Sequence, residues 1–334
     1  MARTNQRPAA GQSVDFVEPM QCLPVAKLPE GPDWGYEIKF DGYRALGIKR
    51  AGAVRLLSRN ANDFSARYPS IARALEKLPD DTIVDGEVIA LADDGRPSFN
   101  VLQNYNHAGT SLQFYVFDLL QLRRKDLCDR PLDERRELLR LEIMPLMTNE
   151  ILLSESLEAS AAEVVAAVKA QRLEGVIAKR RSSRYEPGKR SGAWVKMRIN
   201  KGQELVIGGY VPAGGNFDSV VVGYYEGDDL IYVARVRNGF VPASRAKVFQ
   251  RFKGLEIKTC PFVNLPQRSK GRWGQGLTAD KMIECRWLRP ELVAQIEYAD
   301  WTDASHLRHA KFIGLRDDKP ASDVHREIAD ELSD

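Results

Sequence analysis

The chain has 334 residues, of which 43% are hydrophobic and 28% charged, and its formal net charge at pH 7 is +3. This length allows two domains with separate cores, and the composition is ordinary for a globular protein. No run of about 18 apolar residues occurs, so we expect no membrane span. The four cysteines form no Cys-x-x-Cys pair, which argues against a zinc ribbon and suits a reducing cytoplasm. The small net charge permits a polyanionic partner without requiring one.

The first part of the chain carries mainly strand signals. Residues 1–16 contain Arg and Pro without a following apolar core, so they predict a flexible tail and not a secretory signal. Aromatic and apolar residues from Trp34 to Ile48, interrupted by Gly42, predict a strand, a turn and a second strand. Further strands are expected over 82–91, 112–120, 174–179 and 193–199.

Two helices are expected between these strands. One begins within residues 131–134, with Asp133 as its N-cap, and the basic run that follows predicts a solvent-facing surface. The other begins at Ser160, because Ser160 and Glu163 have the spacing of a capping box, and it ends near Arg172.

The character of the sequence changes after Gly202. Short segments rich in β-forming residues follow, separated by Gly and Asp turns, at 204–210, 219–225, 230–236 and 292–301. Several short strands of this kind predict a small barrel or sandwich. We therefore expect one domain over 17–200 and a second domain over 203–334.

The segment Glu37-Ile38-Lys39-Phe40-Asp41-Gly42 places a lysine inside a predicted strand. An unpaired buried ammonium is costly, so this lysine either pairs with an acid or lines a cleft where its amine is reactive. Lys-x-Asp-Gly alone favours an exposed or ion-paired strand lysine, so the case for a nucleophile depends on the downstream residues. Other polar residues within predicted strands or turns follow in the order Arg59, Glu87, Asp118, Glu174, Lys196 and Arg198.

This order of motifs resembles the covalent nucleotidyltransferase superfamily of ATP-dependent DNA ligases and mRNA capping enzymes. The resemblance runs from Pro19 to Pro320, and it is greatest to the ligase module of bacterial non-homologous end-joining ligase D. The segments EGVIAKRRSSRYEPGKRSGAWVKMR (174–198) and HLRHAKFIGLRDDKP (306–320) carry it. It implies an α+β nucleotidyltransferase (adenylation) domain followed by an all-β OB-fold domain. It also implies ATP as a substrate, used with Mg²⁺ or Mn²⁺.

The resemblance further implies how the nucleoside would be bound. Lys39 would be the nucleophile that displaces pyrophosphate from ATP and holds AMP as a phosphoramidate. Glu37 and the backbone of Ile38 would read the amino edge of adenine, and Phe117 would stack on the ring. Glu87 would accept a hydrogen bond from a ribose hydroxyl.

The charged groups around the phosphates follow from the same resemblance. Arg44 and Arg59 would contact phosphate, with Arg59 gripping the 5′-phosphate of a nick. Glu174, together with Asp41, would hold the metal as hard oxygen ligands do. Lys196 would neutralise the α-phosphate in the transition state.

Some of these positions depart from the family or lie near the end of the chain. Arg198 would act beside Lys196 on the α-phosphate. The family usually has a second lysine where Arg198 stands, so the charge is kept but the forked guanidinium differs in geometry from an ammonium. Arg316 and Lys319 would contact the β- and γ-phosphates in the first step, and would then move away by a rotation near Lys201.

The remaining polar residues have weaker signals. The run 268–273, with Lys270 and Arg272, is either a DNA-contacting loop or a solvated one, since cations beside an aromatic residue suit both. Asp118 is expected to be structural. Four isolated histidines are interpreted as surface or packing residues, namely His107, His306, His309 and His325.

We therefore expect an ATP-dependent DNA ligase that seals 3′-hydroxyl/5′-phosphate breaks in duplex DNA, located in the cytoplasm at the nucleoid and used in DNA repair, recombination or end joining. The expected partners are duplex DNA with nicks or broken ends, a Ku-like end-binding protein, and a separate polymerase and nuclease; no membrane is expected. An RNA ligase or a capping-type nucleotidyltransferase is the alternative within the superfamily. An NAD-dependent ligase would normally bring an N-terminal domain and a four-cysteine zinc module. A silent DNA-binding module would be expected to have lost Lys39 or Lys196.

Overall fold

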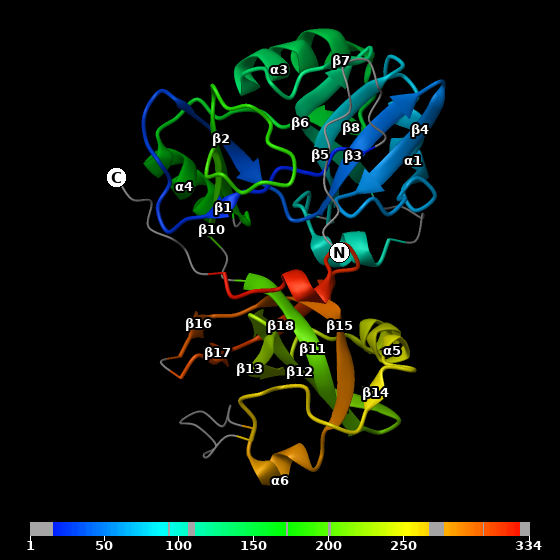
Figure 1. The fold of residues 1–334 in the computed structure, drawn as a ribbon, viewed down its shortest axis with the longest axis vertical. Helices are drawn as coiled ribbons and strands as arrows, with labels where there is room; N and C mark the ends of the chain where they lie inside the picture. Colours follow the sequence, from blue (N-terminus) through cyan, green and yellow to red (C-terminus); the bar gives the residue numbers. More distant parts are fainter. Residues whose placement is uncertain are drawn as a thin grey trace. The chain divides into compact units, whose positions relative to one another are not determined.

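The chain divides after Ile199 into two structural units, which Figure 1 shows as ribbons. The computed structural model describes residues 16–92, 94–105, 111–171, 173–199, 202–266, 277–302 and 304–327. No helix within these ranges is long and apolar enough to cross a membrane. The expected hinge residue Lys201 and most of the expected tail, 1–16, lie outside the described residues.

The first unit is built on two β-sheets. The small sheet has the strand order β1 (Leu23–Pro24), β10 (Trp194–Arg198), β9 (Gly175–Arg180) and β2 (Trp34–Lys39). The large sheet has the order β4 (Ala53–Ser58), β3 (Tyr43–Arg50), β5 (Thr82–Ala90), β6 (Leu112–Leu122) and β7 (Lys125–Asp126), with β8 (Ile151–Leu153) also paired to β6. Neighbouring strands are antiparallel except for the β1–β10 and β6–β8 pairs.

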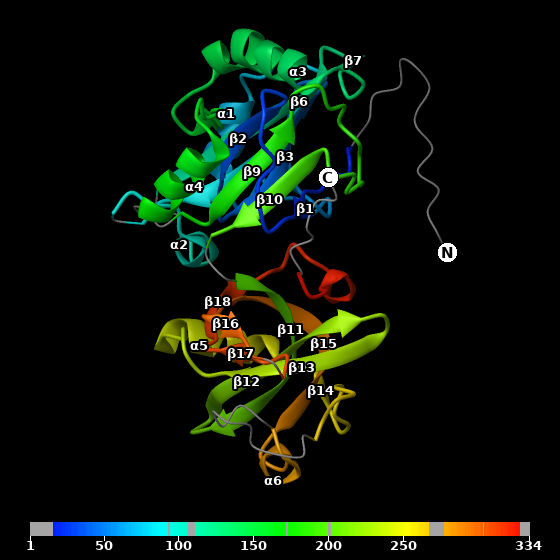
Figure 2. The ribbon, with the colours of Figure 1, turned by 90° about the vertical axis from the view of Figure 1, so that its left-hand side faces the viewer.

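Short helices cover these sheets. They are α1 (Pro69–Leu75), α2 (Phe99–Gln103), α3 (Leu132–Leu138) and α4 (Ala161–Ala170), with a π-helical turn at Leu139–Ile143 and a 3₁₀ turn at Met144–Leu146. The capping box predicted at Ser160 is present, since the Ser160 and Glu163 side chains each accept from the other's backbone N–H. The apolar face of α4 packs on one side of the small sheet, where Val164 and Val168 meet Tyr36, Val176 and Val195. Figure 2 shows α4 beside β9 and β10.

The predicted strand, turn and second strand near the start of the chain are confirmed as β2 and β3. The chain leaves the small sheet at Lys39 and enters the large sheet at Tyr43, so the Lys-x-Asp-Gly segment is the crossing between the two sheets. Gly42 is required at this crossing, because a Cβ there would lie 2.2 Å from the Val88 carbonyl oxygen. The motif therefore has a structural constraint as well as a chemical one.

The prediction for α3 was wrong in two respects. The helix begins at Leu132 after Pro131, and Asp133 lies in its first turn without capping it. Proline is suited to a helix start because its missing N–H has no partner there in any case. The basic run behind it does not face solvent, because Arg135 and Arg136 are buried.

The second unit is a β-barrel. Its strands are β11 (Gly202–Ala213), β12 (Asn216–Glu226), β13 (Asp229–Val236), β14 (Glu256–Ile257), β15 (Arg286–Glu297) and β18 (Lys311–Leu315), with a small hairpin of β16 (Asp300–Trp301) and β17 (Leu307–Arg308). Its helices are α5 (Pro242–Arg251) and α6 (Ala279–Met282), with a 3₁₀ turn at Ala321–Asp323. The strand predicted over 292–301 begins six residues earlier than expected and ends at Glu297.

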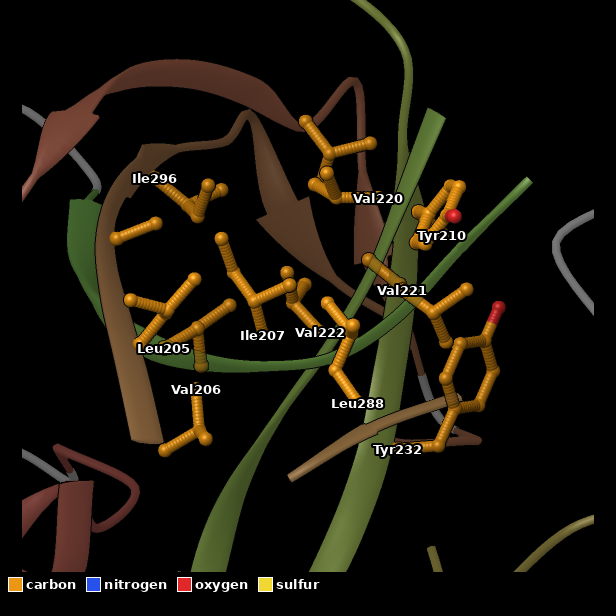
Figure 3. Packing of buried hydrophobic residues seen from close by; sticks show 14 of the residues in the cluster. Leu205, Val206, Ile207, Tyr210, Val220, Val221, Val222, Tyr232, Leu288 and Ile296 are labelled. Carbon is orange, nitrogen blue, oxygen red and sulfur yellow. The ribbon is translucent and has the colours of Figure 1, made fainter. Parts of the chain in front are cut away.

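Antiparallel pairs link β13, β12, β11, β15 and β18 in that order, and a parallel bridge between Asn238 and Lys311 closes the circuit. Buried apolar residues of these strands form one cluster, which includes Leu205, Ile207, Val222 and Leu288 (Figure 3). Closure removes the exposed strand edges that an open sheet of this size would present. Of the two alternatives expected from the sequence, a small barrel or a sandwich, the barrel is the one found, and it agrees with the expected OB-fold.

A single glycine tests how tightly the small sheet is packed. Changing Gly175 to Ala is expected to destabilise the first unit by about 3 kcal/mol or more, because the new Cβ would lie 2.2 Å from the Met197 carbonyl oxygen in β10. Gly35→Ala is the matched control in β2, where the new Cβ would meet the Ser156 hydroxyl at 3.1 Å, and a side chain can move away. Thermal unfolding of both variants checks the difference. Equal melting temperatures would contradict the packing described here.

Candidate functional site

The strand register of the small sheet brings four of the predicted site residues to one face. Lys39 in β2 lies opposite Gly175 in β9, which lies opposite Arg198 in β10. Residues that face each other across antiparallel strands project to the same side, and so do residues two apart along one strand. We call this side the site face and define it by Glu37, Lys39, Gly175, Ile177, Lys179, Trp194, Lys196 and Arg198. The opposite side packs against α4.

Lys39 is paired with an acid at the end of β2. Its Nζ lies 2.5 Å from Glu174 Oε2, and the Arg198 Nε lies 3.5 Å from Glu174 Oε1. The Lys39 and Glu174 side chains are only 16% and 14% exposed. One carboxylate is thus shared by two cations in a largely desolvated position, where electrostatic interactions are stronger than in water. The first of the two possibilities raised by the sequence, a lysine paired with an acid, is confirmed.

Glu37 is buried in a closed network of polar side chains. Its Oε1 accepts from Arg136 Nη1 at 2.9 Å, and its Oε2 accepts from the Ser154 hydroxyl at 2.9 Å. Lys179 Nζ lies 2.9 Å from the same Oε1, close enough for an ion pair although the two groups are not aligned as a hydrogen bond. Three partners therefore occupy most of the acceptor capacity of this carboxylate, and about one lone-pair position is left for a ligand.

Lys179 lies on the site face beside the aromatic residue predicted to stack on the base. Its Nζ is 4.1 Å from the centre of the Phe117 ring and 4.4 Å from that of Trp194. Burial lowers the pKa of the Lys179 ammonium, and the nearby Glu37 carboxylate opposes this. Phe117 itself is half-buried and packs edge-to-face on Trp194. The aromatic and cationic groups thus adjoin one another next to Glu37.

Arg44 is placed differently from the phosphate contact that the sequence suggested. Its Nε and Nη2 donate to the two oxygens of buried Asp85 at 3.0 and 2.6 Å, and its Nη1 donates to the Met20 carbonyl at 2.5 Å. Burial acts to lower the pKa of Arg44, but Asp85 more than offsets this and holds it above its usual value. Tyr185 donates to Asp85 at 2.7 Å, and burial together with Asp85 raises the pKa of this phenol. Arg44 therefore acts as an internal bridge in this structure.

The remaining predicted residues of the first unit lie on strands of the large sheet or at strand ends. Glu87 in β5 is directly opposite Arg44 in β3 and Tyr115 in β6. Arg59 follows the last residue of β4, in the turn where the Ser58 backbone N–H donates to the Asn62 carbonyl. No group of three or more His, Cys, Asp or Glu side chains in metal-binding proximity occurs among the described residues.

The two predicted phosphate-binding residues of the second unit are held in ion pairs. Arg316 Nε and Nη2 each lie 2.9 Å from an oxygen of Asp318, and this pair is almost fully buried. Lys319 Nζ lies 3.1 Å from Glu204 Oε2. Lys270 and Arg272, expected in a DNA-contacting loop, lie outside the described residues.

The arginines of α3 and the buried Lys179 were not among the site residues predicted from the sequence. Arg135 forms a fully buried pair with Asp118, with Nε–Oδ1 and Nη2–Oδ2 both at 2.8 Å. This explains why Asp118 is structural, as expected. The available signal was helical spacing, because Arg135 and Arg136 stand three and four residues after Leu132 and so share its buried face.

The histidines behave largely as the sequence suggested. His306 is buried against Tyr232, and burial lowers its pKa. His325 is exposed and its Nδ1 contacts the Tyr225 carbonyl. His107 lies outside the described residues.

Comparison with protein families matches both units. Residues 20–198 match the family model described as "ATP dependent DNA ligase domain", and residues 213–319 match the one described as "ATP dependent DNA ligase C terminal region". The first match alone covers more than half of the chain.

Curated relatives and a solved structure agree with these models. The chain is 36% identical over 331 residues to the multifunctional non-homologous end joining DNA repair protein LigD of Mycobacterium tuberculosis, a match that covers 97% of this chain and 41% of that protein. It is 33% identical over 319 residues to LigD of Pseudomonas aeruginosa, covering 93% and 36%. The chain therefore spans about two-fifths of these relatives. A structure titled mycobacterial DNA ligase D complexed with ATP and MES aligns with a TM-score of 0.67 and 32% identity, covering 93% of this chain and 98% of that one.

The buried Arg135–Asp118 pair can be tested by removing one charge at a time. Arg135→Met is expected to destabilise the protein by about 3–5 kcal/mol, because it leaves the Asp118 carboxylate buried without a cation. The double variant Asp118→Leu with Arg135→Met should regain much of this loss, since no charge is then buried. Arg130→Met, on a partly exposed arginine, serves as the control. Additive losses in the double variant, measured by thermal unfolding, would contradict the pairing.

Proposed function

This chain belongs to the ATP-dependent DNA ligase family, and we propose that it seals 3′-hydroxyl/5′-phosphate breaks in duplex DNA through an AMP adduct on Lys39. The family resemblance read from the sequence, the adenylation domain followed by an OB-fold, and ATP as the substrate are confirmed. The boundary between the two domains is proposed to lie at 200–203, as the sequence suggested. The proposal depends most on one observation, the position of Lys39 in a row with Gly175 and Arg198, paired to Glu174.

The first step forms a phosphorus–nitrogen bond and releases pyrophosphate. The Lys39 amine attacks the α-phosphorus of ATP once it has lost a proton, and the electron pair of the breaking P–O bond leaves with pyrophosphate. Lys196 and Arg198 lie on the same face as Lys39, so their charges can balance the charge that develops on the α-phosphate oxygens. In the second step AMP passes to the 5′-phosphate of the DNA, and in the third the 3′-hydroxyl displaces AMP.

The nucleoside would be bound beside the polar network of the site face. Phe117 is half-buried and offers a ring for stacking, and Glu37 keeps about one lone-pair position that suits the amino group of adenine. Lys179 is a donor next to that ring and would face a ring nitrogen, which accepts in adenine. The Ile38 backbone would add a further contact, and Glu87 would accept from the ribose.

Glu174 is a suitable oxygen ligand for Mg²⁺ or Mn²⁺, and Asp41, two residues after Lys39, would be the second. Magnesium is usually held by one or two carboxylates and completes its shell with substrate phosphates and water, so the Glu174 carboxylate beside Lys39 fits this demand. When bound, the ion supplies positive charge at the phosphates. Its binding to Glu174 would compete with Lys39 for the same carboxylate and so leave the amine without its counter-ion.

The remaining cations are given separate roles. Arg59, at the end of β4, would grip the 5′-phosphate of the broken strand. We now give Arg44 a positioning role, because three of its nitrogen atoms already donate to Asp85 and to the Met20 carbonyl. Arg316 and Lys319 would act on the β- and γ-phosphates of ATP in the first step only.

The DNA substrate and partners are inferred from the relatives. Two of these are named as multifunctional non-homologous end joining proteins, so we place this chain in end-joining repair, in the cytoplasm at the nucleoid, with a Ku-like end-binding protein and with polymerase and nuclease activities. Lys270 and Arg272 would contact the DNA backbone. Binding that depends mostly on phosphate contacts should weaken steeply as salt rises.

Lys39→Ala is expected to abolish transfer of label from α-labelled ATP to the protein, because the adduct is proposed to form on the Lys39 amine, whereas the other amines of the site face, those of Lys179 and Lys196, are given binding roles. Lys39→Arg should fail as well, since a guanidinium is not deprotonated at neutral pH. Lys49→Ala, in the neighbouring strand β3, is the control and should label normally. Peptide mass spectrometry locates the adduct, and labelling of Lys39→Ala would refute the assignment.

Arg316→Ala and Lys319→Ala are expected to lower the rate of protein adenylylation at least tenfold while sparing the sealing of DNA that is already adenylylated. The reason is that β- and γ-phosphates are present only in the first step. The two assays are run on the same preparations, with Arg308→Ala in β17 of the same unit as the control. Equal losses in both assays would count against this role.

A further inference from the structure

The side chain of Arg136 in α3 is hydrogen-bonded to both sheets of the first unit at the site. Its Nη1 donates to Glu37 Oε1 at 2.9 Å in the small sheet and to the Phe117 carbonyl at 3.1 Å in the large sheet. Its Nη2 donates to the Ser154 carbonyl at 2.6 Å. The Ser154 hydroxyl in turn donates to Glu37 Oε2 at 2.9 Å, so Arg136, Glu37 and Ser154 form a closed ring of hydrogen bonds.

We infer that Arg136 is a positioning residue that sets the adenine-binding half of the site, by fixing Glu37 and the backbone of Phe117 at a constant distance from each other. The inference rests on the proposed function, since it concerns the pocket in which ATP would be bound. Glu37 lies on the same strand as Lys39, two residues before it, and Phe117 belongs to the other sheet. A single guanidinium that holds both therefore also sets where the base lies relative to the nucleophile.

The chemistry of this position favours arginine over other residues. A guanidinium is planar and carries five donors in a rigid fork, so it can bond a carboxylate and two carbonyl oxygens at once. A lysine at this position keeps the charge but reaches fewer of these acceptors. Arg136 is only 7% exposed, which means that its partners would be left buried and unsatisfied if it were removed.

The charge balance around Glu37 indicates that the fold would survive this loss. Glu37 is paired with Lys179 as well as with Arg136, so removing the arginine still leaves the carboxylate with a buried cation. What disappears are the three hydrogen bonds of Arg136, and with them the direct link between Glu37 and the Phe117 carbonyl, while the bond from the Ser154 hydroxyl to Glu37 remains. The expected consequence is a misplaced base pocket within a folded protein, and small misplacements of this kind are costly to binding and catalysis.

The test compares Arg136→Met with Arg136→Lys, Ser154→Ala and the control Arg140→Met. Arg140 stands one turn further along the same helical segment and is about half exposed, with surface ion pairs to Glu137 and Glu155. Formation of the Lys39 adduct is measured against ATP concentration. For Arg136→Met we expect the KM for ATP to rise about tenfold while kcat falls less than about threefold. Arg136→Lys and Ser154→Ala should shift the KM in the same direction by less, and Arg140→Met should not shift it.

Two inhibitors separate the base side of the pocket from the phosphate side. Adenosine carries the base without phosphates, and tripolyphosphate carries the phosphates without the base. In Arg136→Met the inhibition constant of adenosine should rise together with the KM for ATP, and that of tripolyphosphate should stay within about twofold of the wild-type value. A purely structural role would instead lower the active fraction and leave both constants unchanged.

The outcomes are distinguishable. A KM within about twofold of wild type, or an equal weakening of both inhibitors, would overturn the positioning role while the adduct on Lys39 still forms. Absence of any adduct on wild-type Lys39 would overturn the proposed function itself. If circular dichroism shows that Arg136→Met does not fold, Arg136→Lys and Ser154→Ala decide the matter by the same constants.

Discussion

The site depends on the antiparallel register of β2, β9 and β10. In this register Lys39, Gly175 and Arg198 stand in one row, and residues two positions away form the next row on the same face. A slip of one residue in any pair would turn the chemical groups towards α4 and bring apolar residues to the site. Packing of Val176 and Val195 against α4 therefore specifies the position of the nucleophile as well as the stability of the sheet.

Buried charges are concentrated where the two sheets meet. The Arg135–Asp118 pair is fully buried, and Glu37 is shared between Arg136 and Lys179. Such pairs add little net stability, because desolvation offsets most of their attraction, but breaking one is expensive. Their effect here is to restrict geometry. The aromatic ring and the carboxylate that would meet adenine belong to different sheets, and Arg136 of α3 is hydrogen-bonded to both residues.

The two predicted phosphate-binding residues of the second unit, Arg316 and Lys319, form ion pairs with carboxylates of the same unit. Arg316 is bound to Asp318 and Lys319 to Glu204, so neither cation is buried without a counter-ion. A phosphate that binds either residue must replace its carboxylate partner. Because one anion is exchanged for another, the net change in free energy is small. That suits a group needed in one step of a reaction and not in the next two.

The sequence by itself determined the order of the motifs, the strand–turn–strand around Gly42, the capping box at Ser160 and the barrel that follows Gly202, since local periodicity, turn residues and motif spacing encode these. The sequence did not determine which charged side chains are buried or which partner each of them has. From the sequence, Arg44 and the arginines of α3 are interpreted as surface or ligand-binding residues. The folded chain shows that they form ion pairs with buried acids. The partners in the Arg44–Asp85 and Lys39–Glu174 pairs are 41 and 135 positions apart, so only tertiary packing brings them together. Once both groups are buried, pairing with each other costs less free energy than leaving either charge without a partner.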